Sequence, residues 1–315
     1  MTFDQFTETE CIEFFRFTRS EIRQILPYLE LDQITYRYRY QASAEEAFCV
    51  LLSRLSSNKR LKDEMRLFGK SRTWQSVIFN DVVTYLVTRY QEKLEWDSQR
   101  LTYKQLNQYA DHVGLPAERI WGFVDGTLKV VCRPKKHQRR WYSGYKKRHA
   151  VKFQAIATPD GLISHLAGPF EGKLGDWSAW KQSKIENHLQ AVQPRSRRRL
   201  YVYGDPAYSA GFGVIGPYKA LPHQPLPLRT QAFNAYMSSL RIAVEHSFSK
   251  ISALWPFVTH SRALKIDHSP VGGYYMIAVL LTNIHTCLRG SQISTQFSCP
   301  PPSLAEYLSL GLAAQ

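Results

Sequence analysis

The apolar residues in the first hundred positions recur at the three- and four-residue spacing of amphipathic helices. Residues 22–29 place their Ile and Leu side chains on one helical face, and Thr18 with Glu21 just before them forms a capping-box pattern. Ser43 with Glu46 repeats that pattern before a second apolar face. This part of the chain is therefore predicted to be helical.

A glycine interrupts the helical pattern between residues 61 and 80. The sequence predicts a helix over 61–68, a turn at Gly69 and a second helix that opens at Ser71. This order is typical of a helix-turn-helix, whose second helix offers polar side chains to a DNA groove. The candidate side chains are Arg72, Thr73, Gln75 and Ser76. A plain helical hairpin packed on the rest of the protein has the same pattern, so both interpretations stay open.

Near residue 115 the pattern changes to short runs rich in β-branched and aromatic residues, which predict strands. The predicted strands cover 123–131, 150–158, 162–169 and 200–203, with a turn at Pro159-Asp160-Gly161 between the second and the third. Helices are predicted over 177–189 and 234–254. We therefore expect a helical region at 1–115, an α/β domain at 116–290 and a tail at 291–315.

Three acids stand out in the α/β region. Asp125 and Asp205 are each presented by a predicted strand, and Glu245 lies on the long helix. Taken singly, each has an ordinary explanation, because Asp often caps a turn and Glu245 can pair with Arg241 one turn earlier for about 0.2–0.5 kcal/mol. Taken together, three carboxylates would raise one another's pKa, and divalent cations with oxygen ligands remove that repulsion. Two such ions about 3.5–4 Å apart catalyse phosphoryl transfer.

The charge balance favours a polyanionic partner. Lys and Arg number 41 against 26 Asp and Glu, a net charge of +15, and nucleic acid is the commonest partner for such excess. A plain basic surface is the alternative. Residues 133–148 hold eight of the cations with three aromatic residues, which suits phosphate contacts and base stacking. The candidate DNA contacts there are Lys135, Lys136, Arg139, Arg140, Lys146, Lys147 and Arg148. A second basic run, 195–199, fits a nuclear-import signal, a phosphate patch or a solvated surface equally well.

Other classes of protein are disfavoured. The five cysteines are scattered without metal-ligand spacing, which predicts reduced thiols inside a cell. The N-terminal residues are acidic and polar, unlike a signal peptide. The longest apolar run, 274–281, is too short to span a bilayer. We expect a soluble protein without a membrane partner.

The three acids and their neighbours resemble the DDE transposases of PIF/Harbinger type and the host nucleases derived from them. Val124-Asp125-Gly126-Thr127 is similar to the family's first acidic motif, 204–208 to its second, and 241–248 to the helix that carries its glutamate, with 40 residues between Asp205 and Glu245. Residues 172–177 are similar to the family's Gly-Ser-x-His-Asp segment but lack its Ser and His, so the resemblance assigns no role to Asp176. Residues 18–80 are similar to the helical segment before the nuclease domain.

The resemblance implies an α/β fold, an RNase H-like mixed sheet flanked by helices and preceded by the helix-turn-helix-like region. It implies DNA cleavage at element ends with Mg²⁺ or Mn²⁺, followed by strand transfer through the freed 3′-OH. Asp125, Asp205 and Glu245 would be the catalytic and metal-binding residues, with Arg241 on a phosphate or on Glu245. The resemblance also points to the nucleus and admits a Myb-like accessory protein and an oligomer. The alternatives are a domesticated, catalytically silent DNA-binding or interaction protein and an RNA-acting nuclease of the same fold.

Overall fold

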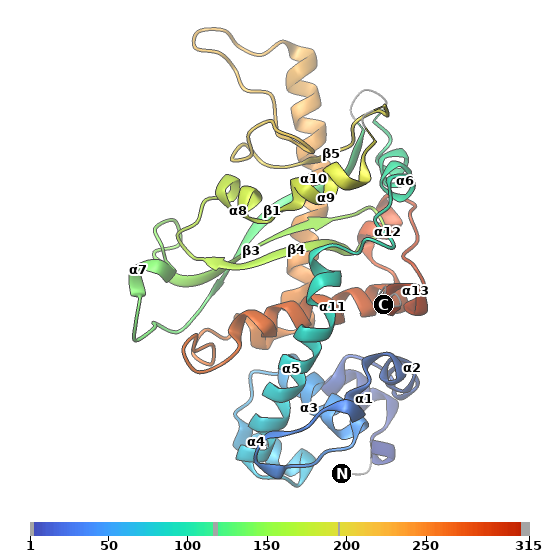
Figure 1. Ribbon diagram of the computed structural model, residues 1–315, viewed down its shortest axis with the longest axis vertical. Coiled ribbons are helices and arrows are strands. Elements are labelled where there is room, and N and C mark those ends of the chain that lie inside the picture. The colour runs from blue at the N-terminus through green and yellow to red at the C-terminus, as the bar shows by residue number, and fades with distance from the viewer. Residues whose placement is uncertain (1–2, 116–118, 195, 310–315) are drawn as a thin grey trace.

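The computed structural model describes residues 3–115, 119–194 and 196–309. Within them the chain folds around a six-stranded mixed sheet flanked by helices, which is the predicted α/β class with an RNase H-like arrangement (Figure 1). The strands are β1 (Ile120–Val130), β2 (Tyr142–Ser143), β3 (Arg148–Ala157), β4 (Ile163–Glu171), β5 (Tyr201–Tyr203) and β6 (Val214–Ile215). The order is β2-β3-β1-β5-β6, with β4 paired to β3. The chain runs antiparallel from β1 through β3 to β4, whereas β5 and β6 add to β1 in parallel.

The region before the sheet is helical, as predicted. Its helices are α1 (Glu8–Phe15), α2 (Arg19–Leu29), α3 (Ala44–Ser56), α4 (Leu61–Phe68), α5 (Arg72–Glu95) and α6 (Tyr103–Val113), with short 3-10 turns at Phe3–Gln5, Leu31–Gln33 and Arg37–Arg39. The capping box fixes where α2 begins, because the Thr18 hydroxyl accepts from the Glu21 amide while the Glu21 carboxylate accepts from the Thr18 amide. Ser43 caps α3 through the Glu46 amide.

The helices of the second region are α7 (Gln138–Trp141), α8 (Asp176–Gln182), α9 (Ile185–Val192), α10 (Leu228–Leu254), α11 (Val271–Arg289), α12 (Gln292–Gln296) and α13 (Leu304–Leu308), with a 3-10 turn at Pro256–Thr259. The helical stretch predicted over about 177–189 is confirmed, but it is divided into two helices. Ser183 ends α8 and Lys184, at φ 56°, adopts a left-handed conformation before α9 begins. The predicted helix 234–254 is confirmed and starts six residues earlier, at Leu228.

The helical region shares one hydrophobic cluster with β3, β4 and α11, while a second cluster packs α6 and α10 against β1 and β5. Phe48 of α3 and Ile78 of α5 belong to the same buried cluster as Phe153 of β3 and Ile277 of α11. Helix α11 lies between the sheet and the N-terminal helices (Figure 1). By length and composition α11 could cross a membrane, but most of it is buried, as in the core helix of a globular protein. The predicted boundaries at 115 and 290 therefore stay predictions.

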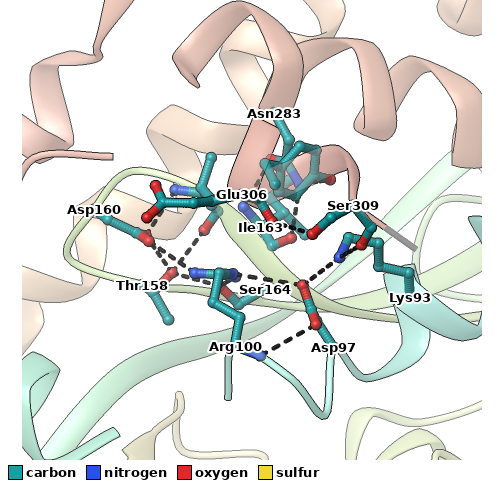
Figure 2. Close-up of polar contacts among 12 residues, drawn as sticks. Lys93, Asp97, Arg100, Thr158, Asp160, Ile163, Ser164, Asn283, Glu306 and Ser309 are labelled. Carbon is teal, nitrogen blue, oxygen red and sulfur yellow. Dashed lines mark hydrogen bonds and ion pairs between the residues drawn. The ribbon is translucent and has the colours of Figure 1, made fainter. Parts of the chain in front are cut away.

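A buried ion network ties the end of α5 to the β3–β4 turn (Figure 2). Arg100 Nη1 lies 2.9 Å from Asp160 Oδ2, and Arg100 Nη2 donates to the Ser164 hydroxyl at 2.7 Å. Lys93 pairs with Asp97 at 2.7 Å and also donates to the Ser309 carbonyl. The network thus reaches the predicted tail, whose helices α12 and α13 pack onto the fold; residues 310–315 of that tail lie outside the described residues.

Candidate functional site

Asp125 and Asp205 lie at matching positions of two parallel strands. In the β1–β5 ladder Phe123 pairs with Tyr203, and each acid stands two residues farther along its chain. Asp205 follows the end of β5, as predicted. Asp125 instead lies within β1, because β1 continues to Val130 against β3, where Asp125 faces Ala155. Strand β1 is hydrogen-bonded to β3 on one side and to β5 on the other. This pairing fixes the Asp125 backbone near the turn that carries Asp205.

Arg241 of α10 joins the acid on the sheet to the acid on the helix. Its Nη1 lies 3.2 Å from Asp125 Oδ2, and its Nη2 lies 2.9 Å from Glu245 Oε1. The contact with Glu245 is the one-turn pair expected from the sequence. The contact with Asp125 spans 116 residues and arises because α10 packs along β1. One guanidinium thus holds two of the three predicted acids.

The site has more negative charge than Arg241 balances. The pKa of Asp125 is raised to about 6, mainly by burial, and the negative charges of Asp205 and Asp176 contribute to this rise. The Gly126 amide, which donates to Asp125 Oδ1 at 2.8 Å, and the Arg241 guanidinium act in the opposite direction without cancelling the rise. Asp205 Oδ1 accepts from the Ala207 amide at 2.9 Å. A further cation would therefore be stabilised among these carboxylates.

Asp176 is a further acid of this site, and it was assigned no role from the sequence. It is the first residue of α8, and its Oδ1 lies 2.9 Å from Nζ of Lys152, a buried lysine on β3. A Cβ placed on Gly126 would overlap this Oδ1, so the Asp176 carboxylate lies directly against the β1 backbone beside Asp125. The signal that could have found Asp176 is its place at the end of segment 172–177, where the resembling motif also carries Asp.

A metal centre is not assembled in the present side-chain positions. Among residues 3–115, 119–194 and 196–309, no three His, Cys, Asp or Glu side chains form a group that could hold an ion. Between Asp125 and Glu245 the positive charge is supplied by Arg241. The donor set nevertheless fits a divalent cation in type, because Asp125, Asp205 and Glu245 offer carboxylate oxygens, the ligands that Mg²⁺ prefers.

The predicted phosphate contacts of residues 133–148 surround α7 and β2. Residues 133–148, here called the basic projection, extend from the sheet on the side away from α6 and α12 (Figure 1). All seven candidates are exposed, and Arg140 pairs with Glu171 at 2.7 Å. These residues are Lys135, Lys136, Arg139, Arg140, Lys146, Lys147 and Arg148.

The predicted helix-turn-helix residues differ from one another in accessibility. Helices α4 and α5 are joined at Gly69, whose φ of 62° gives the left-handed turn. Arg72 and Thr73 are exposed. Gln75 is only 1% exposed, and its amide donates to the Lys70 carbonyl at 3.1 Å. The expectation that Gln75 contacts DNA is therefore corrected: its side chain packs inside the helical region.

Comparison with known proteins agrees with this geometry. A family model described as DDE superfamily endonuclease matches residues 124–283, just over half of the chain. The matched segment contains Asp125, Asp205 and Glu245, together with Asp176 and Arg241. No curated protein and no solved structure gives a significant match. With its acidic motifs on the expected strands and helix, the chain belongs to the DDE superfamily endonucleases.

Proposed function

We propose that the protein is a divalent-metal-dependent DNA endonuclease of PIF/Harbinger type, which hydrolyses phosphodiester bonds at the ends of a mobile element and joins the freed 3′-OH to target DNA. The observation that carries this proposal is the meeting of distant acids at Arg241. Asp125 and Glu245 contact the same guanidinium, and Asp205, two residues beyond the Phe123–Tyr203 pair, is near enough for its charge to act on Asp125. Membership of the DDE superfamily endonucleases supports a nuclease in general.

In this proposal Asp125, Asp205 and Glu245 hold Mg²⁺ or Mn²⁺. When bound, the ions supply an activated water and stabilise negative charge on the attacking and leaving oxygens. The protein contributes position: β1 is paired on both sides near Asp125, and α10 carries Glu245 on a continuous helix. Arg241 lies where it can bind a phosphate oxygen with the same nitrogens that contact the acids, since guanidinium binds carboxylate and phosphate alike.

DNA is the proposed substrate and partner. The exposed cations on both sides of α7 would contact phosphates without reading sequence, and Arg72 and Thr73 at the start of α5 would approach a groove. Nuclear location belongs to the same proposal. Of the basic run 195–199, Arg197 and Arg199 are exposed and lie over the rings of Tyr103 and Phe212, whereas residue 195 lies outside the described residues. The proposal also includes a Myb-like accessory protein as a partner and assembly of the protein into an oligomer.

Nicking of supercoiled plasmid in Mg²⁺ or Mn²⁺ tests the proposal. We expect the wild type to nick the plasmid, and Asp125→Asn and Glu245→Gln to bind it without nicking. Asp32→Asn, at an exposed acid of the helical region, is the matched control and should nick normally. Tight duplex binding by a wild type that never nicks would favour the catalytically silent DNA-binding protein. Preferential cleavage of a structured RNA in the same assay would favour the RNA-acting nuclease.

A further inference from the structure

A cavity of about 470 Å³ lies beside the turn that carries Asp205, and neither the acids nor the basic projection accounts for it. Its volume is in the range of small-ligand sites, roughly 300–1,000 Å³. Four of its ten lining residues are aromatic, and one is a lysine. These residues are Tyr201, Tyr208, Tyr218, Lys219 and Phe233.

The cavity shares its walls with the candidate active site. Tyr208 closes the turn that Asp205 opens, its amide donating to the Asp205 carbonyl at 3.0 Å. A Cβ on Gly216 would lie 3.1 Å from the same carbonyl, so the lining loop packs directly on the backbone of Asp205. On α10, Phe233 precedes Arg241 by eight residues, two helical turns or about 12 Å along the same side. A ligand that contacts Phe233 in the cavity would therefore lie about 12 Å along α10 from Arg241, which contacts the acids.

The aromatic rings of the cavity are held in place. The Asn234 side chain accepts from the Tyr218 amide at 3.0 Å and donates to the Tyr218 carbonyl at 2.9 Å. The Tyr218 and Phe233 rings meet edge to face, with centroids 5.6 Å apart at 62°. Tyr218 nevertheless keeps 51% of its surface exposed. The loop thus presents a fixed, accessible aromatic surface, which lowers the entropic cost of binding a flat ligand.

A buried polar group without a hydrogen-bond partner among the described residues lies at the end of β5, two residues before Asp205. Tyr203 is 1% exposed, and its hydroxyl has no hydrogen-bond partner among the described residues. Tyr201 and Tyr203 point to the same face of β5, since alternate strand residues share a face. A buried, unpaired hydroxyl costs free energy unless a ligand satisfies it.

We propose that this cavity binds a single unpaired nucleobase of the DNA whose phosphate lies at the acids. Every base has a π-face, so aromatic rings stack on it with little regard to sequence, and a base can reach a concave pocket only by leaving the duplex. Lys219 at the edge suits the neighbouring phosphate. This inference rests on the proposed function and adds to it a subsite for an extruded base.

Fluorescence anisotropy with two labelled DNA duplexes tests the subsite. Both have the same mixed sequence, and one carries a single unpaired base as a bulge; EDTA prevents cleavage. We expect the wild type to bind the bulged duplex more tightly. Phe233→Ala should weaken that binding about tenfold, within the contribution of base stacking, and leave the paired duplex unaffected. Tyr236→Ala, three residues along α10 and outside the cavity lining, is the matched control and should change neither.

Tyr218→Ala is a second variant that separates loss of binding from loss of folding, because the half-exposed Tyr218 ring can be removed with little loss of core packing. It should weaken binding of the bulged duplex as Phe233→Ala does. Equal weakening of both duplexes, or of neither, by the two variants would overturn the subsite. Plasmid nicking is scored separately. Nicking that needs Asp125 without a bulge preference rejects the subsite alone, whereas a bulge preference that needs Phe233 in a protein that never nicks rejects the nuclease alone.

Discussion

Asp125 and Asp205 occupy equivalent places in a parallel pair of strands, each two residues beyond the paired residues Phe123 and Tyr203. Chain segments that leave a parallel ladder in register remain neighbours, which explains why the charge of Asp205 helps to raise the pKa of Asp125. The match is set by backbone pairing and does not depend on a bound ion.

This arrangement predicts that divalent cations stabilise the folded protein. At an ion concentration of about 100 times the dissociation constant, binding to the native state alone adds about 2.7 kcal/mol to the free energy of unfolding. The midpoint of thermal unfolding in MgCl₂ or MnCl₂, compared with EDTA, measures this gain. It should be present in wild type and in Asp32→Asn, and absent in Asp205→Asn. An equal gain in all three proteins would place the ion elsewhere.

Gly126 is predicted to be required because of Asp176. A Cβ at position 126 overlaps Asp176 Oδ1, which Lys152 holds in place. Gly126→Ala should therefore lower the free energy of unfolding by about 1–3 kcal/mol, the usual cost of overpacking. In an Asp176→Ala background the same substitution should cost clearly less, which urea unfolding of all four proteins in the cycle measures. Equal costs in both backgrounds would show that the two positions do not interact.

The basic projection is predicted to bind phosphates without sequence preference. Changing Lys146, Lys147 and Arg148 to Gln removes three phosphate contacts, so the slope of log affinity against log salt should become shallower by about 2.7 for B-DNA. The loss of affinity should be the same for unrelated duplexes. A control with the same net charge changes three exposed cations elsewhere and should keep the wild-type slope. Its substitutions are Lys184→Gln, Arg262→Gln and Lys265→Gln.

The buried network of Figure 2 is predicted to be critical for stability. Asp160→Asn removes the nearer counter-charge of the buried Arg100 guanidinium and leaves the longer 3.8 Å contact with Asp97, and breaking a buried pair costs about 3–5 kcal/mol. Asp111→Asn breaks a pair with Arg119 whose acid is 60% exposed, and it should cost less than about 1 kcal/mol. Chemical denaturation of the two variants makes the comparison. Similar costs would mean that solvent or other groups compensate Arg100.

Local signals predicted most of the elements correctly. The Thr18 capping box placed the start of α2, and Pro159-Asp160-Gly161 placed the β3–β4 turn, because each depends on residues within four positions of one another. Contacts between segments that are distant in the sequence were harder to predict from sequence patterns. The Arg241–Asp125 pair depends on how α10 lies along β1, and the burial of Gln75 depends on how α5 packs. Periodicity shows which face of an element is apolar and leaves open which segment covers it.

Helix α10 is continuous over 27 residues, about 40 Å, from Leu228 at its outer end to Leu254 in the core. Phe233 lies near one end, Glu245 in its second half, and buried Trp255 directly follows its last turn. The helix is therefore one continuous rod whose C-terminal end is buried. A displacement of the outer end would therefore also move Glu245, which lies 17 residues, or about 25 Å, from Leu228 along the same helix.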